Sequence, residues 1–235
     1  MPSSTSKRIT AMKQNASALL HLENLSSDLS GIVFDCDGVL FDSKEANTAY
    51  YNHIRFAVHM PPMTEEEAAY SHMVSTDEAI ERMVPDELLE EARNVRNRTK
   101  YRDTFMPMMQ PARNAFACLR SLHETGIRLA LCTNRSDSVH EVLRHFDIEH
   151  YFSPVMTITQ VQPKPSPAGL LEILKLWETT PESIAFIGDS LVDQQAAAAA
   201  GVPFWSYDNP QLAAEMHITD FKELEEIVHL MCMRE

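Results

Sequence analysis

The sequence predicts an α/β fold in which a parallel sheet is covered by helices on both faces. Short apolar runs rich in strand-forming residues alternate with amphipathic stretches of helical length, as in βαβ units. A glycine-free segment, residues 45–113, interrupts this alternation and contains no clear strand. With 235 residues, 44% of them hydrophobic, the chain is large enough for one core domain and a small accessory domain.

The first predicted strand, Gly31–Phe34, is followed at once by Asp35-Cys36-Asp37-Gly38. Both aspartates would lie at the carboxyl end of a buried parallel strand, where open α/β sheets bind their ligands. Two acids this close suit Mg²⁺, and an aspartate with an ordinary pKa of about 3.9 is ionised at neutral pH and able to attack phosphorus. A calcium-binding loop also begins Asp-x-Asp, but its glycine comes later and a helix precedes it.

The segment before this strand shows little predicted structure, whereas the segment after it is predicted to be helical. Residues 1–30 form an N-terminal extension with one modest amphipathic stretch, residues 11–22, and no identifiable chemistry. Within residues 45–113, the capping-box patterns at Thr64–Glu67 and Ser75–Glu78 mark helix starts, and prolines punctuate the segment. Three or four helices are therefore predicted to form a small domain inserted after the first strand.

From residue 114 onward, helices and strands alternate regularly. Periodicity and flanking glycines predict, in order, a helix over 115–125, a strand over 127–132, a helix from about 137, a weaker strand over 155–158, a helix over 168–177, a strand over 184–187, a helical run over 196–200 and a strand over 202–206. Connections of this length favour parallel pairing of the strands.

Polar residues follow three of these strands. Thr133-Asn134-Arg135-Ser136 offers a hydroxyl and backbone N–H groups ahead of a helix, which suits an anion site, although Thr133 or Ser136 as a simple helix cap explains the pattern equally well. Lys164 lies between two prolines, which would aim its ammonium at a phosphate; taken alone, an ordinary surface lysine in a proline-rich turn is the better interpretation.

The strand over 184–187 ends in Gly188-Asp189. Asp189 would complete the metal site begun by Asp35 and Asp37. Asp193 fits a capping box with Ser190, so it either starts the following helix only or also faces the waters of the metal.

Together these patterns resemble, in order, the four motifs of the haloacid dehalogenase superfamily: Asp35-x-Asp37-Gly38-Val39, Thr133-Asn134, Lys164-Pro165 and Gly188-Asp189-x-x-x-Asp193. The resemblance covers residues 31–209, and the helical insert is similar to the cap of the phosphoglycolate-phosphatase-like and β-phosphoglucomutase-like branch. It implies a Rossmann-like three-layer core, residues 31–44 and 114–235, with an α-helical cap over residues 45–113.

The resemblance also implies catalytic and metal-binding roles. Asp35 would be the nucleophile that forms an aspartyl-phosphate. Asp37 would protonate the leaving alcohol and then deprotonate water, which requires a raised pKa. Mg²⁺ would be bound by Asp35, the backbone carbonyl of Asp37, and Asp189, while Asp193 would orient ligands or waters.

Substrate-binding roles follow in the same way. The Thr133 hydroxyl and the Asn134 N–H would hold the phosphoryl oxygens, Gly38 would contribute to the same binding site, and Lys164 would neutralise charge between the nucleophile and the phosphate. Two histidines of the insert, His53 and His72, are candidates for substrate contact, although a lone helical histidine is more often a surface or core residue.

The composition of the chain limits the classes of molecule that it could bind. A formal charge of −14 argues against a nucleic-acid or anionic-membrane surface, and no stretch has the length of a transmembrane helix or the core of a signal peptide. The four cysteines show no metal-binding spacing and are expected to be reduced thiols in a cytoplasmic protein.

The predicted function is that of a Mg²⁺-dependent phosphatase whose substrate is a small phosphorylated metabolite. The alternatives are a phosphomutase and a non-catalytic phosphate-binding regulatory module. No oligomeric state is predicted.

Overall fold

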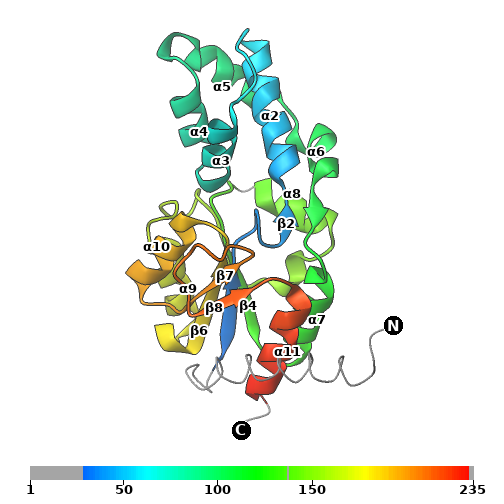
Figure 1. Ribbon diagram of the computed structural model, residues 1–235, viewed down its shortest axis with the longest axis vertical. Helices are drawn as coiled ribbons and strands as arrows, with labels where there is room; N and C mark the ends of the chain where they lie inside the picture. Colours follow the sequence, from blue (N-terminus) through cyan, green and yellow to red (C-terminus); the bar gives the residue numbers. More distant parts are fainter. Residues whose placement is uncertain (1–28, 137, 233–235) are drawn as a thin grey trace, which may run out of the picture.

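A six-stranded, fully parallel sheet forms the centre of the protein in the computed structural model, which describes residues 29–136 and 138–232 (Figure 1). The extension predicted over residues 1–30, with its amphipathic stretch, lies almost entirely outside the described residues. The strand order is β5-β4-β1-β6-β7-β8. The strands are β1 (Gly31–Phe34), β4 (Arg128–Cys132), β5 (Val155–Met156), β6 (Ile184–Gly188), β7 (Phe204–Tyr207) and β8 (Met216–Ile218).

Helices cover both faces of this sheet, which confirms the predicted three-layer α/β fold. Of the helices that flank the sheet, three contribute to the hydrophobic cluster on one face and two to the cluster on the other. The first group is α7 (Ala115–Glu124), α8 (Ser138–His145) and α11 (Phe221–Cys232), and the second is α9 (Ala168–Trp177) and α10 (Leu191–Ala200). Alternation along β1 supplies both faces, with Ile32 and Phe34 in the first cluster and Val33 in the second.

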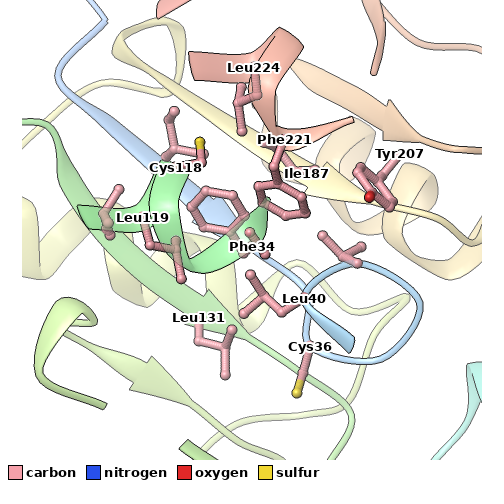
Figure 2. Packing of buried hydrophobic residues seen from close by; sticks show 14 of the residues in the cluster. Phe34, Cys36, Leu40, Cys118, Leu119, Leu131, Ile187, Tyr207, Phe221 and Leu224 are labelled. Atoms are coloured by element: carbon pink, nitrogen blue, oxygen red, sulfur yellow. The ribbon is translucent and has the colours of Figure 1, made fainter. Parts of the chain in front are cut away.

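Aromatic packing beneath the carboxyl end of β1 fixes the position of the residues that follow it. Phe34 is fully buried and stacks on Phe221 of α11 with 6.1 Å between ring centroids (Figure 2). The Phe152 ring meets the Phe34 ring edge-on at 6.3 Å. Leu131 of β4 and Ile187 of β6 belong to the same cluster. Burial of each of these large side chains contributes about 1.5–3 kcal/mol, so the strand end is held firmly.

The helical insert extends from the carboxyl edge of the sheet and has a hydrophobic cluster of its own, which includes Tyr50, Ile54, Ile80 and Phe105 (Figure 1). Its helices are α2 (Lys44–Ala57), α3 (Glu65–Met73), α4 (Thr76–Met83), α5 (Leu89–Arg98) and the single turn α6 (Tyr101–Thr104). Short 3-10 turns at Asp86–Leu88 and Met106–Met108 accompany them. The prediction of three or four helices therefore missed one short helix.

A two-residue antiparallel ladder joins the insert to the core, between β2 (Phe41–Asp42) and β3 (Gln110–Pro111). This ladder was not predicted, because strands of two residues are too short to show any alternation of apolar and polar residues. The capping box at Thr64–Glu67 is present, whereas at the next helix the Ser75 hydroxyl accepts the Glu78 N–H.

The remaining differences concern the bounds of two strands and the last two elements of the chain. β5 is two residues shorter than predicted, and β7 begins after Pro203 rather than at residue 202, because proline has no N–H to donate to a ladder. Neither β8 nor α11 was predicted from the sequence. No described helix is long and apolar enough to cross a membrane, and Cys36, Cys118 and Cys132 are free and buried.

Candidate active site

The polar residues that follow the central strands meet at the carboxyl edge of the sheet, beneath the helical insert. β1 lies between β4 and β6, so the ends of these three strands are adjacent, as at the ligand-binding edge of other open α/β sheets. A cavity of about 580 Å³ lies there between core and insert. Of the predicted site residues, those that line it are Asp35, Asp37, His72, Thr133, Asn134 and Lys164.

Lys164 forms the centre of a buried ionic cluster. Its Nζ lies 2.8 Å from Asp35 Oδ1 and 2.5 Å from Asp193 Oδ1, and its side chain is 3% exposed. Burial lowers the pKa of Lys164, but the Asp193 and Asp35 carboxylates raise it by more, so the ammonium stays charged. The interpretation of Lys164 as an ordinary surface lysine is therefore wrong.

Asp35 has one oxygen fixed and the other open to a ligand. Oδ1 accepts the Cys36 N–H at 2.7 Å in addition to Lys164, and no described residue donates a hydrogen bond to Oδ2. Burial raises the pKa of Asp35 to about 7, although Lys164 opposes the shift. The assumption that this carboxyl keeps its ordinary pKa is wrong, because the strand end that positions it also removes it from water.

Asp35, Asp189 and Asp193 can place one carboxylate oxygen each within 4.8 Å of one another. Burial, followed by the charges of Asp193 and Asp35, raises the pKa of Asp189 to about 8. Three carboxylates share a single ammonium here, and this excess of negative charge on hard oxygen donors fits a divalent cation such as Mg²⁺. Asp193 Oδ1 is held by Lys164, while its Oδ2 accepts the Ser190 N–H and hydroxyl, so Asp193 suits an orienting role better than direct coordination.

Asp37 is held by the guanidinium of Arg135, a contact that was not predicted. Arg135 Nε lies 2.6 Å from Asp37 Oδ2 and Arg135 Nη2 lies 2.7 Å from Oδ1, while Ser43 and Asn47 also donate to Oδ1. Burial by itself would raise the pKa of Asp37. The charge and hydrogen bonds of Arg135, together with the Ser43 hydroxyl, lower the pKa by more than burial raises it, so that it falls to about 2. The expectation of a raised pKa at Asp37 is therefore wrong for this arrangement.

Arg135 also connects the core to the insert. Its Nη2 lies 3.3 Å from both Asn47 Oδ1 of α2 and the Tyr101 hydroxyl of α6, and its guanidinium lies over the Tyr101 ring at 5.2 Å. The Tyr101 hydroxyl in turn donates to Asn47 Oδ1 at 2.8 Å. The same side chain that holds Asp37 thus contacts two helices of the insert.

The residues after β4 are partly occupied in holding the site together. The Thr133 hydroxyl oxygen accepts the Arg135 N–H at 3.1 Å. The Asn134 side chain accepts the Lys164 N–H at 2.7 Å and donates to the Lys164 carbonyl and to the Met73 carbonyl, both at 3.0 Å. Asn134 therefore fixes the loop that carries Lys164 and contacts the end of α3.

Gly38 differs from its predicted role in substrate binding. Its N–H donates to the Phe41 carbonyl at 2.8 Å, and the residue does not line the cavity. The backbone has φ +77° at Gly38, and a Cβ there would lie 2.1 Å from Asp189 Oδ2. The glycine is required because the turn after β1 passes directly against the acidic cluster.

A doubly wound sheet with a cation-binding acidic cluster and a buried lysine at its switch point defines a class of α/β enzymes that act on anionic ligands. Residues 32–206 match the model of the haloacid dehalogenase-like hydrolases, and the chain belongs to this family.

Relatives and solved structures agree with this assignment. The chain is 30% identical over 205 residues to phosphoglycolate phosphatase of Salmonella paratyphi A and 29% identical over 205 residues to that of Escherichia coli K12; each alignment covers 77% of this chain and 81% of the relative. A haloacid dehalogenase-superfamily hydrolase of subfamily IA from Geobacter sulfurreducens has a TM-score of 0.71 and 35% identity, covering 88% of this chain and 99% of its own. A haloacid dehalogenase-like family protein from Streptococcus pneumoniae, 16% identical, shares the fold with a TM-score of 0.69, over 87% of this chain and 100% of its own.

Proposed function

We propose that this protein is a Mg²⁺-dependent phosphatase that hydrolyses a small phosphorylated metabolite through an aspartyl-phosphate. The observation that carries the proposal is the pairing of Asp35 with Lys164 in a buried cavity, which leaves one carboxylate oxygen open beside a fixed ammonium. The similarity to phosphoglycolate phosphatases makes 2-phosphoglycolate the first substrate to test.

In the first step, Asp35 Oδ2 attacks phosphorus and the bond from phosphorus to the substrate's ester oxygen breaks. Lys164 and the Thr133 hydroxyl would offset the charge on the phosphoryl oxygens, a contribution worth about 3–4 kcal/mol for a well-placed donor. Asp37 would give its proton to the leaving alkoxide. Because Arg135 holds Asp37 ionised in the present arrangement, this donation requires Arg135 to move away from Asp37 when substrate binds, so that Asp37 takes up a proton from solvent or keeps the one it accepted from water in the preceding turnover.

In the second step, water attacks the aspartyl-phosphate, Asp37 accepts the proton of that water, and the bond between phosphorus and Asp35 breaks to release phosphate. An ionised Asp37 is already suited to this role. Asp35 and Asp189 would hold Mg²⁺ together with the Asp37 backbone carbonyl, and Asp193 would support the site from behind. The bound ion would supply positive charge that neutralises the phosphoryl group and favours the ionised form of both carboxyls.

The domain boundaries form part of the same proposal, with a core over residues 31–44 and 114–235 and a cap over residues 45–113. The separate hydrophobic cluster of the insert and its place over the cavity support them. A cytoplasmic location is proposed as well, and the buried, unpaired cysteines support a reducing compartment.

A panel of phosphorylated metabolites, assayed for phosphate release with Mg²⁺, tests the proposal. We expect release from at least one small phosphate monoester. Incubation with β-glucose 1-phosphate separates the alternatives, since glucose 6-phosphate as the main product would establish a phosphomutase. A folded protein that releases no phosphate from any member of the panel would instead favour a non-catalytic binding module.

A further inference from the structure

Arg135 is a buried cation whose charge is balanced by a single residue of the active-site cavity. Its side chain is 11% exposed and lines the cavity together with its side-chain hydrogen-bond partners Asp37, Asn47 and Tyr101. Within the described part of the chain, Asp37 is the only carboxylate that forms an ion pair with this guanidinium. Asn47 and Tyr101 offer no negative charge, because burial raises the pKa of Tyr101 and keeps its hydroxyl protonated.

The pairing of Arg135 with Asp37 has the geometry in which a guanidinium also binds phosphate. Arg135 Nε and Nη2 lie 2.6 and 2.7 Å from the two oxygens of one carboxylate, so two N–H groups meet two oxygens. Arginine binds phosphoryl groups through the same planar fork. The Asp37 carboxylate therefore occupies a position on Arg135 that also suits two phosphoryl oxygens.

This guanidinium lines the same cavity as the groups proposed to hold the phosphoryl group. Arg135 follows Thr133 in the loop after β4, and its backbone N–H donates to the Thr133 hydroxyl oxygen at 3.1 Å. Asp37 follows Asp35 after β1; burial raises the pKa of Asp35 most, and the charges of Asp193 and Asp37 add to the shift. The ion pair is thus close to both the proposed nucleophile and the predicted anion-binding loop.

The remaining carboxylates that line the cavity form no ion pair with Arg135 in residues 29–136 and 138–232. They either pair with other cations or are exposed: Asp35, Asp77, Asp103 and Glu141. Removing one partner of a buried ion pair is strongly destabilising, because the other charge stays buried and unpaired. When Arg135 leaves its carboxylate, as the proposed mechanism requires, its charge therefore needs a new anion. Every phosphate monoester brings one in its phosphoryl group.

We propose that Arg135 binds the phosphoryl group of the substrate, and that the Asp37 carboxylate competes with this group for the guanidinium. The inference rests on the proposed phosphatase function and deepens it, since it adds a phosphoryl-binding residue and gives the separation of Arg135 from Asp37 a cause. The insert takes part, because Asn47 and Tyr101 contact the guanidinium from α2 and α6. The Tyr101 ring, 5.2 Å from the guanidinium carbon, keeps it at the cavity as its anionic partner changes.

Binding of inorganic phosphate in the presence of Mg²⁺, measured by NMR titration of the protein, tests this competition without turnover. The wild type, Asp37→Asn, Arg135→Gln and the double variant form a double-mutant cycle. We expect Arg135→Gln to weaken phosphate binding by about tenfold to a hundredfold, the range for hydrogen bonds to a charged group, and Asp37→Asn to strengthen it by about tenfold. In the Arg135→Gln background, the gain from Asp37→Asn should fall below about threefold.

Two further variants complete the measurement. Arg144→Gln is the matched control: Arg144 pairs with Glu149 at 3.3 Å, its side chain is 59% exposed, and phosphate affinity should stay at the wild-type value. Arg135→Lys keeps the charge without the planar fork and should recover part of the affinity that Arg135→Gln loses. Where Arg135→Gln does not fold, Arg135→Lys takes its place in the cycle, and the gain from Asp37→Asn should again be smaller than in the wild-type background.

An equal gain from Asp37→Asn in both backgrounds would overturn the inference, because it would mean that the negative charge of Asp37 repels phosphate without competing for Arg135. Unchanged affinity in Arg135→Gln, or no phosphate binding by Asp37→Asn, would overturn it as well. The proposed function is tested separately by turnover. A coupled cycle in a protein that hydrolyses no phosphate monoester would contradict the function alone, and an uncoupled cycle in an active phosphatase would contradict this inference alone.

Discussion

Replacement of Lys164 by methionine tests the ionic cluster most directly. Methionine keeps the unbranched shape of lysine but removes the ammonium that lies 2.8 Å from Asp35 and 2.5 Å from Asp193. Because the Lys164 side chain is only 3% exposed, loss of its ammonium leaves buried carboxylates without a counter-charge. Breaking a buried pair in this way costs about 3–5 kcal/mol, so we expect the free energy of unfolding at pH 8 to fall by that amount.

The loss should depend on pH in a defined direction. Without Lys164, the folded-state pKa of Asp35 rises further, because the charge that opposes the effect of burial is lost, and the folded protein binds a proton that the unfolded chain has already released. Stability from such groups is present below the unfolded pKa of about 4 and is lost as pH rises through the folded pKa. The variant should therefore be closer to the wild type at pH 5, where the carboxyls can be protonated, than at pH 8.

Urea denaturation in EDTA at pH 5 and pH 8 measures both effects, because the chelator removes any cation that would replace the missing charge. Lys175→Met is the matched control: Lys175 pairs with Glu172 at 3.0 Å, but its side chain is 74% exposed, and such a pair contributes less than about 1 kcal/mol. A decrease below about 1 kcal/mol for Lys164→Met at pH 8, or an equal decrease at both pH values, would refute the account of the cluster.

Three further predictions concern the same site. Asp35→Asn should abolish phosphate release while leaving the thermal midpoint within a few degrees of the wild type, and residual turnover above contamination would exclude Asp35 as the nucleophile. Mg²⁺ should raise the thermal midpoint relative to EDTA more at pH 8 than at pH 5, because Asp35 and Asp189 have pKa values of about 7 and 8 and hold protons that the ion must displace; equal stabilisation would contradict this. Gly38→Ala should destabilise the protein by at least about 1–2 kcal/mol, given φ +77°, and weaken Mg²⁺ activation, since its Cβ would meet Asp189; wild-type Mg²⁺ dependence would refute the close approach.

The residues at strand ends were predictable because one geometric rule governs them. Parallel strands place their carboxyl ends at one edge, so Asp35, Thr133 and Asp189 follow from the positions of three apolar runs in the sequence. The core strands and α9 were predicted within one or two residues for the same reason, since each is a buried run of ordinary length bounded by turn residues. The short elements β2, β3 and β8 were not, because their lengths give no periodicity.

Contacts between the core and the insert could not be predicted by such a rule. Arg135 lies two residues after Thr133, within a stretch already assigned to anion binding, yet its partners Asp37, Asn47 and Tyr101 are distant in sequence. Nothing in their spacing indicates that they meet, because the relative position of the insert depends on the folded arrangement of all its helices. The pKa of Asp37 follows from this contact, which is why its predicted direction was wrong.

The charges of the site explain how an acidic chain can bind a phosphorylated substrate. The two positively charged core residues that line the cavity already form ion pairs, Lys164 with two carboxylates and Arg135 with Asp37. Further positive charge for a phosphoryl group must therefore come from a bound cation at the acidic cluster, from the insert through Lys100 and Arg102, or from release of Arg135 when the substrate arrives. Each source acts only when metal, insert and substrate are assembled, so we expect the apo protein at a formal charge of −14 to bind phosphate weakly and more weakly still as salt increases.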